Sequence, residues 1–217
     1  TIGKSNNIII KNITIDVSAV TSKTSHGIYF VDTCTNIWID SCVIIAKNVT
    51  DTGYDCIHQL TTIGCLTDIY IMNNTLIDGF HGVYLAGPSK RNINVNICNN
   101  NVNSFLVGIR LRQTNFTNIN NNYVTRNSNT ARWCHGIMFI GPCFGKELCN
   151  NRINMSGVGG PPYASWSAAG LSFYQSNVQG ASATNRLLVA NNEIIITAST
   201  GSNGQAAKGI YCSSAPT

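Results

Sequence analysis

Short runs of alternating apolar and polar residues recur along the whole chain. One repeated motif, called the first phrase below, consists of an apolar-x-apolar strand, one spacer residue and then an Asn-type residue. Its seven copies span Ile8–Asn12, Ile37–Ser41, Ile69–Asn73, Val95–Asn99, Thr117–Asn121, Lys146–Asn150 and Leu187–Asn191. Alternation with period two is typical of β-strands that bury one face. Each copy therefore predicts a short strand that ends at a turn.

A second phrase lies between the copies of the first, with a small residue followed by apolar-x-apolar. Its copies span Gly27–Phe30, Cys56–Gln59, Gly82–Leu85, Gly108–Leu111, Gly136–Phe139, Gly170–Phe173 and Gly209–Tyr211. A repeat this short cannot bury its own apolar face, so it must stack on its neighbours. Antiparallel hairpins would need Asn-Gly or Asp-Gly turns in register, which the repeats lack. The pattern predicts an all-β parallel β-helix, a solenoid of about seven coils.

The Asn-type residue of the first phrase has a physical role at the turn. Asparagine tolerates the left-handed backbone region, and its amide can bond to the same amide in the next coil. Asn73, Asn99, Asn121 and Asn150 are expected to stack in this way. The apolar residues expected inside the coils beside them are Ile71, Ile97, Ile119 and Leu148.

Length and composition narrow the class of protein. The 217 residues fit one domain, 1–217, and because the sequence opens at Thr1 on a strand-like run we expect a fragment of a longer chain. Charged residues are 11% of the chain, against a usual share of about 25%. The net charge of +5 is scattered, so no nucleic-acid partner is expected. No apolar run approaches the roughly 20 residues of a membrane span, so no membrane insertion is expected.

The nine cysteines form no CxxC pair and no Cys/His pair at zinc spacing. They are interpreted mostly as small buried hydrophobic residues. We therefore expect neither a metal site nor a cofactor.

The segment Gly27–Asp40, with its Asn-Ile-Trp-Ile-Asp stretch, resembles the coils of the pectate-lyase-like superfamily of right-handed parallel β-helices. Ser41 stands where pectate lyases carry a histidine, and their acidic calcium-binding cluster is not evident. Among β-helices, a composition rich in Asn and Ile and poor in charged residues is most similar to that of bacteriophage tailspikes.

The tailspike resemblance implies a homotrimeric rod on the virion tail that binds a bacterial surface polysaccharide, and it leaves open whether the protein also depolymerises it. Two alternatives stay open. One is a secreted, monomeric pectate-lyase-like polysaccharide lyase or glycoside hydrolase. The other is a purely structural β-helix, because this fold does not fix function.

Alternation also indicates which side chains of the second phrase leave the rod. The outward column is Tyr29, His58, Tyr84, Arg110, Met138, Ser172 and Tyr211, and Arg112 and Tyr174 follow two residues further along their strands. Tyrosine stacks on sugar rings and arginine forms bidentate bonds to carboxylates. His58, Tyr84 and Arg110 are the candidate catalytic residues, with Tyr29, Arg112 and Tyr174 as binding residues. The shortest connections precede Gly82 and Gly108, which predicts a notch there. A solvated sheet face with no ligand is the alternative.

Two further features carry open interpretations. The loop 157–167 presents Tyr163 and Trp166, either as binding residues or as a loop packing on the rod. A column of His26, Asp55, His81 and His135 precedes the small residues. It is either a proton-transfer group or a structural hydrogen-bond ladder.

The carboxylates favour lyase over hydrolase chemistry, if bonds are cleaved at all. A glycoside hydrolase needs two acids about 5 to 9.5 Å apart, and the outward column contains none. A lyase needs a base such as His58 or Tyr84, with Arg110 neutralising a uronate carboxylate. The outward face with Trp38, Tyr70 and Glu147 is the competing location.

Overall fold

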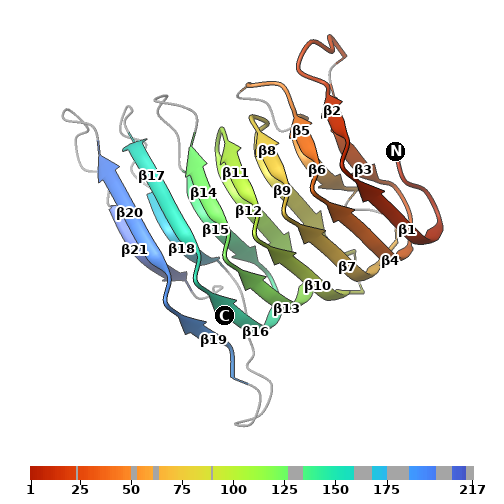
Figure 1. Cartoon of the computed structure of the whole chain (residues 1–217). Helices are drawn as coiled ribbons and strands as arrows, with labels where there is room; N and C mark the ends of the chain where they lie inside the picture. Colours follow the sequence, from red (N-terminus) through yellow and green to blue (C-terminus); the bar gives the residue numbers. More distant parts are fainter. Residues whose placement is uncertain are drawn as a thin grey trace.

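The repeated phrases form strands in a right-handed parallel β-helix (Figure 1). The computed structural model describes residues 1–22, 24–49, 53–60, 64–88, 90–126, 134–158, 168–174, 186–198 and 207–213. Twenty-one strands make three parallel sheets of seven, and neighbours within a sheet come from successive coils. Within the described ranges, no helix is long and apolar enough to cross a membrane.

We call the three sheets A, B and C. Along the chain, each coil contributes one strand first to sheet B, then to sheet C and then to sheet A. Sheet B contains β1 (Ser5–Lys11), β4 (Cys34–Asp40), β7 (Leu66–Met72), β10 (Asn92–Cys98), β13 (Thr114–Asn120), β16 (Phe144–Cys149) and β19 (Leu188–Ala190). Sheet C contains β2 (Thr14–Asp16), β5 (Val43–Ile45), β8 (Thr75–Ile77), β11 (Asn101–Ser104), β14 (Tyr123–Arg126), β17 (Arg152–Val158) and β20 (Glu193–Ala198). Sheet A contains β3 (Ile28–Phe30), β6 (Asp55–Gln59), β9 (His81–Ala86), β12 (Val107–Arg112), β15 (His135–Ile140), β18 (Ala168–Tyr174) and β21 (Ala207–Ser213).

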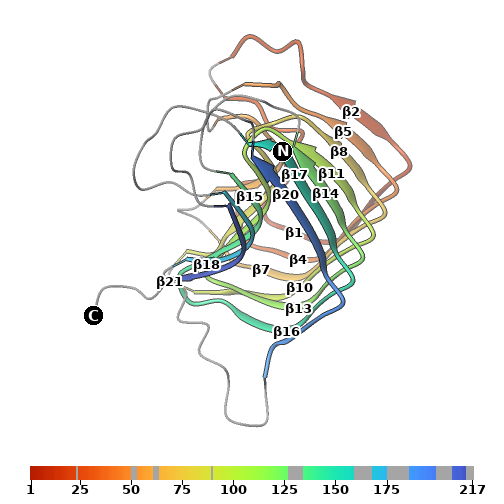
Figure 2. The same ribbon diagram turned by 90° about the vertical axis from the view of Figure 1, so that its left-hand side faces the viewer.

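The predicted register is confirmed. Ile97 pairs with Ile71 on one side and with Ile119 on the other, and all three are fully buried. Viewed after a quarter turn, the strands of each sheet overlie one another, with the apolar core between the sheets (Figure 2). The first phrase therefore builds sheet B, and the second phrase builds sheet A.

The Asn-type column does mark the turn between sheets B and C, but it does not carry the amide ladder. All seven members adopt left-handed backbone with φ between 54° and 60°. Asn73, Asn99, Asn121 and Asn150 do lie at equivalent turns of successive coils, and they are exposed to solvent. The expectation that their side chains bond to one another is corrected by the structure, because from the third coil onward the next residue along the chain forms that ladder.

The ladder is a buried row of amides from Asn74, Asn100, Asn122, Asn151 and Asn192. Asn100 is typical. Its amide nitrogen donates to Oδ1 of Asn122 at 3.0 Å and to the carbonyl oxygen of Ile71 at 2.9 Å. Its Oδ1 accepts from the backbone N–H and the side-chain amide of Asn74, both at 3.0 Å. Every ladder amide thus satisfies backbone groups that the turn would otherwise bury without partners.

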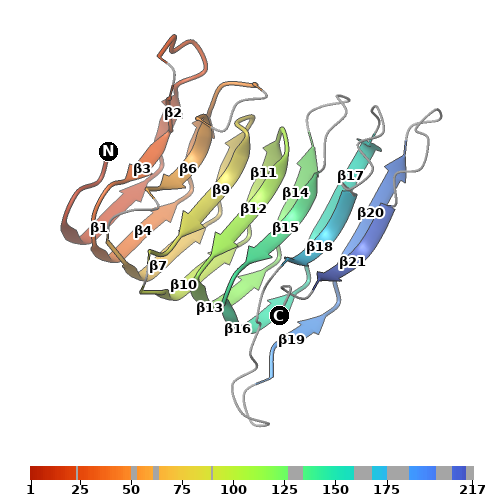
Figure 3. The same ribbon diagram turned by 180° about the vertical axis from the view of Figure 1, so that it is seen from behind.

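The small residues near the start of the sheet A strands lie against side chains of sheet C. A Cβ on Gly108 would lie 2.2 Å from Cγ1 of Val124 and 2.7 Å from the carbonyl oxygen of Gly136. This contact explains the small residue at the start of the second phrase. From behind, β9, β12 and β15 lie side by side with their outer faces toward the viewer (Figure 3).

Candidate functional site

The outward residues of sheet A line up across coils as predicted. Four consecutive members are partly exposed, and we call them the sheet A patch: Tyr29, His58, Tyr84 and Arg110. The next two members of the column, Met138 and Ser172, are buried. The partly exposed members on successive coils therefore lie over β3, β6, β9 and β12, and Tyr211 on β21 is again partly exposed.

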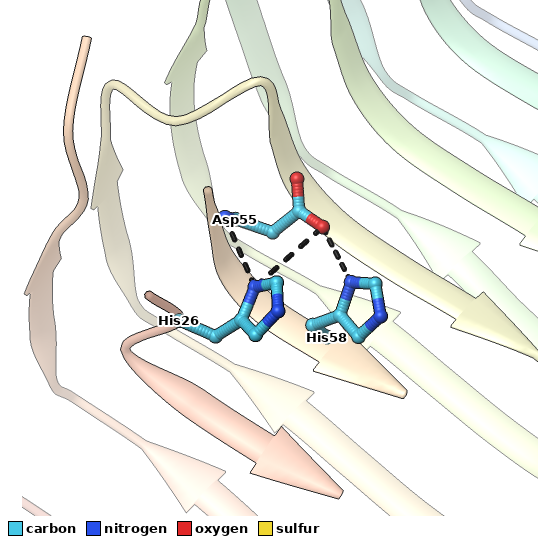
Figure 4. Close-up of side chains that lie close together, drawn as sticks. All are labelled: His26, Asp55 and His58. Atoms are coloured by element: carbon cyan, nitrogen blue, oxygen red, sulfur yellow. Dashed lines mark hydrogen bonds and ion pairs between the residues drawn. The ribbon is translucent and has the colours of Figure 1, made fainter. Parts of the chain in front are cut away.

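A buried carboxylate organises the patch from below. Asp55 is the first residue of β6 and is fully buried. Its Oδ1 accepts from the backbone N–H of His81 at 2.9 Å and from Nδ1 of the same ring at 2.8 Å. Its Oδ2 lies 2.5 Å from Nδ1 of His58 (Figure 4). Both oxygens therefore have partners, as a buried carboxylate requires.

His81 links Asp55 to Arg110 and has a fixed protonation state. Nη1 of Arg110 lies 3.2 Å from Nε2 of His81. A guanidinium can only donate, so Nε2 must accept and the proton must sit on Nδ1, facing Asp55. Burial lowers the pKa of His81, against the pull of Asp55. A neutral ring is the state that both hydrogen bonds demand.

Asp55 stays ionised in this environment. Burial raises its pKa, but the interactions with His81 and His58 outweigh burial and hold the pKa well below its usual value. The guanidinium of Arg110 is also largely desolvated, which lowers the pKa of that group, while Tyr84 and Asp55 oppose the change. Arg110 packs over the ring of Tyr84, with its Cζ 4.8 Å from the ring centroid.

His58 is held as a base would be. Its Nδ1 donates to Asp55, so in the neutral ring the lone pair lies on Nε2. Tyr29 and Tyr84 approach the ring edge-on from either side, with centroids 5.4 and 5.1 Å away. An imidazole oriented by a carboxylate through one nitrogen and free at the other is the arrangement of a general base.

His26 covers one face of His58 without adding charge. The two rings stack with centroids 4.0 Å apart and planes inclined by 17°. Nδ1 of His26 accepts from the backbone N–H of Asp55 at 3.3 Å. Burial, reinforced by His58, lowers the pKa of His26 to about 4. His26 is therefore neutral near pH 7 and orders the ring beside it.

The same three residues are the described group whose ligand atoms could surround a metal ion. A ring nitrogen of each histidine and a carboxylate oxygen of Asp55 lie within 4.8 Å of one another. An imidazole binds a metal through a ring lone pair, yet Nδ1 of His58 carries the proton that it donates to Asp55. That proton would have to leave before this nitrogen could bind an ion. As they lie, the residues fit a shared proton better than a shared metal ion.

The other predicted binding residues lie outside this cluster. Arg112 ends β12 and is exposed, two residues beyond Arg110 on the same face. Tyr174 is also exposed but lies on β18, two coils further along. Tyr163 and Trp166 fall outside the described residues.

The column of His26, Asp55, His81 and His135 is interrupted in the structure between His81 and His135. His81 pairs with Val107, which in turn pairs with His135, so an apolar residue separates the two histidines. Burial, with a smaller effect of Arg110, lowers the pKa of His135 to about 4. The sequence left two interpretations of this column open, a proton-transfer group and a structural hydrogen-bond ladder. The bonds of Asp55 fit both, because they connect neighbouring coils and also orient His58.

The competing face on sheet B is built differently. Trp38 and Tyr70 stack on each other with centroids 4.1 Å apart. Asn96 and Asn118 separate Tyr70 from Glu147 in the register. The two aromatic rings thus bury faces against each other that a sugar would need for stacking.

Sequence reasoning missed the pairing of Asp55 with His58. Alternation places residues 55 and 58 on opposite sides of a strand, so the sequence groups Asp55 with His26, His81 and His135 and allows it to approach the outward column only from the strand end. The pairing arises because Asp55 begins β6 at the corner between sheets C and A, where the side chain can turn outward. An acid three residues before a histidine at a strand start was the available signal.

Comparison with protein-family models, curated proteins and solved structures gave no match. The fold assignment accordingly stands on strand register, and the site stands on its geometry.

Proposed function

We propose that the protein binds an acidic bacterial surface polysaccharide across the sheet A patch and cleaves it by β-elimination. One observation carries the proposal. A buried, ionised Asp55 orients the partly exposed His58 and, through His81, also positions Arg110. A base and a carboxylate-binding cation on the same outer face are the two groups that uronate elimination requires.

Each group has a role in the reaction. Arg110 binds the uronate carboxylate, which makes the proton on the adjacent carbon more acidic. Nε2 of His58 removes that proton, and Asp55 stabilises the imidazolium that forms. The electron pair of the broken C–H bond becomes a carbon–carbon double bond as the neighbouring glycosidic C–O bond breaks. The phenol of Tyr84 supplies a proton to the departing oxygen.

Hydrolysis fits this site less well. A glycoside hydrolase uses two carboxyl groups that flank the scissile bond. In the described part of the chain, Asp55 is the carboxylate under the patch, and its two oxygens are occupied by His81 and His58. A purely structural role would use the same bonds to join coils but would not need an outward Nε2.

The test is product formation from a panel of uronate-containing polysaccharides, followed by the absorbance of the new double bond. We expect His58→Gln to abolish the signal while binding of the polysaccharide is largely kept. Lys4→Gln, an exposed change on the first coil, is the control. Unchanged turnover in His58→Gln, or no unsaturated product from any uronate polymer, would refute the mechanism.

For the biological setting we propose a homotrimeric phage tailspike acting at the virion tail, with a secreted monomeric enzyme as the alternative. The sequence resemblance supports the first setting, as do the exposed apolar side chains of Ile9 (70%) and Ile93 (51%) on sheet B, which suit subunit contacts. The mass in solution tests this setting, because a trimer favours the tailspike and a monomer the secreted enzyme.

A further inference from the structure

A surface hollow of about 470 Å³ lies past the C-terminal end of β12, at the corner where sheet A turns into sheet B. Its lining residues are Lys90, Arg91, Ile93, Gln113, Asn115 and Pro142. None of the six is acidic, and two are cationic.

The hollow results from unequal connections in three successive coils. Five residues, 87–91, connect β9 to β10, and three, 141–143, connect β15 to β16. Between them, Gln113 alone connects β12 to β13. The short turn is therefore recessed between two longer ones. The sequence placed a notch at the start of β9 and β12, whereas this hollow lies at the end of β12.

The walls are held by specific contacts. The guanidinium of Arg91 packs over the ring of Phe144, with its Cζ 4.2 Å from the centroid. The next residue, Asn92, is buried and bonds to Gln59 at 2.6 Å. The side-chain amide of Gln113 lies 2.6 Å from the carbonyl oxygens of Gly87 and Pro88 and donates to both when its nitrogen is turned toward them. Arg91 is thus a positioned cation on an ordered wall, while Lys90 is exposed at the rim.

The hollow is continuous with the end of the sheet A strand. Gly87 donates its backbone N–H to the carbonyl oxygen of Arg112 at 3.0 Å, and Gln113 directly follows Arg112. Arg110 and Arg112 project from the same face about 6–7 Å apart, at roughly 3.3 Å per residue. Cations therefore continue from the sheet A patch, over Arg112, to the hollow.

We propose that the hollow is a second subsite for the same acidic polysaccharide, in which Arg91 and Lys90 bind a sugar carboxylate several units away from His58. This inference rests on the proposed function and adds to it the direction in which the polysaccharide lies. The bound polysaccharide runs past the C-terminal ends of the sheet A strands toward sheet B. A short oligomer would occupy only the patch, whereas a longer one would reach the hollow.

The experiment measures binding of oligogalacturonates of two, four and six units by calorimetry. The variants are Lys90→Gln, the double variant Lys90→Gln/Arg91→Gln, and Arg110→Gln. The charge-matched control is Lys4→Gln/Arg186→Gln, with exposed residues on the first and last coils. We expect the double variant to bind the hexamer about tenfold or more weakly, with dimer affinity equal to the control. Lys90→Gln alone should show the same selectivity to a smaller extent, and its exposed side chain keeps this arm independent of folding.

The outcomes separate the two proposals. If Arg110→Gln weakens dimer and hexamer alike while the double variant matches the control, the hollow is not a subsite and the sheet A patch stands. If the double variant weakens the dimer as much as the hexamer, the inferred chain direction is wrong. If none of these oligomers binds the wild-type protein, the uronate specificity falls, and the hollow falls with it.

Discussion

Arg110 donates from Nη1 to Nε2 of His81 across 3.2 Å, and this single bond makes the orientation of the guanidinium depend on Asp55, which it does not touch. The chain of contacts runs from carboxylate to neutral imidazole to guanidinium. Because Asp55 also binds His58, one buried charge sets both the base and the cation of the patch.

Asp55→Asn is therefore expected to disable both functions together. In either orientation of the new amide, its NH₂ group faces a ring nitrogen that should donate. We expect turnover of a uronate polymer to fall about a thousandfold or more. The free energy of unfolding should fall by about 3–5 kcal/mol, because a buried charge network is broken. Kinetics and urea denaturation check the two effects, with Asp32→Asn as the control. Wild-type turnover in a folded Asp55→Asn protein would contradict this role.

Arg110→Ala should weaken binding of an acidic oligosaccharide by about 1.5–3 kcal/mol, the range for hydrogen bonds to charged groups. Arg110→Lys keeps the charge but loses the planar donor set, so it should recover only part of the affinity. Titration calorimetry measures both. Equal affinity in Arg110→Ala and the wild type would remove Arg110 from the site.

Stability should decline on mild acidification because the fold keeps His26, His81 and His135 neutral. The pKa values of His26 and His135 are lowered to about 4, mainly by burial. An unfolded histidine titrates near 6.5, so the unfolded chain binds more protons between these values. The contribution of these histidines to the free energy of unfolding should be fully present above pH 6.5 and should fall as the pH drops toward 4. Below pH 4 these groups should cause no further loss of stability.

The pKa of His135 is about 4 in the folded protein against about 6.5 in the unfolded chain, so His135 contributes about 3 kcal/mol over that interval. Urea denaturation at stepped pH measures the slope, and His135→Gln should flatten it. An unchanged slope in that variant would show that His135 titrates normally in the folded protein.

Asn100→Ala tests the amide ladder. The change removes the hydrogen-bond partner of the carbonyl oxygen of Ile71 and of the backbone N–H of Asn74. The side chains of Asn74 and Asn122 each lose one hydrogen bond but keep another. At about 1–3 kcal/mol for each unsatisfied group, the cost should be at least about 2 kcal/mol. Asn99→Gly is the matched control, because glycine tolerates the φ of 60° at that exposed turn. A similar loss in both variants would mean that turn conformation, and not the ladder, dominates.

Ile97→Ala should open a cavity in the fully buried core and cost about 2–5 kcal/mol. Tyr84→Ala, at the partly exposed surface of sheet A, should cost far less. Chemical denaturation ranks the two. The opposite ranking would place the inner and outer faces of the coils the wrong way round.

The strands and their register were predictable because alternation is strict and repeats in every coil. The inward isoleucines and the left-handed turn residues followed from that pattern. The identity of the ladder residue did not, although Asn-Asn pairs such as Asn99-Asn100 carried the information. One amide sits at the left-handed position and leaves the next to point inward, and composition alone assigns both to a turn.

The candidate site was predictable only as a surface. The positions of Tyr29, His58, Tyr84 and Arg110 followed from parity, since parallel strands in register align equivalent residues. The contacts of Asp55 with His58 and His81 did not follow from parity, because Asp55 lies at a corner where the side-chain direction departs from alternation. Connection lengths predicted recessed coils at β9 and β12, but the hollow depends on the turns after these strands.

The amide ladder also determines how this protein tolerates change in length. Neighbouring ladder asparagines are separated by 22 residues between Asn100 and Asn122 and by 41 between Asn151 and Asn192. The hydrogen bond that joins each pair is nonetheless the same, at 3.0 and 2.9 Å. The pitch of the rod is thus independent of how much chain each circuit contains. New binding loops can be inserted between sheets C and A or between sheets A and B while the strands stay in step, which gives the scaffold room to acquire new ligands without refolding its frame.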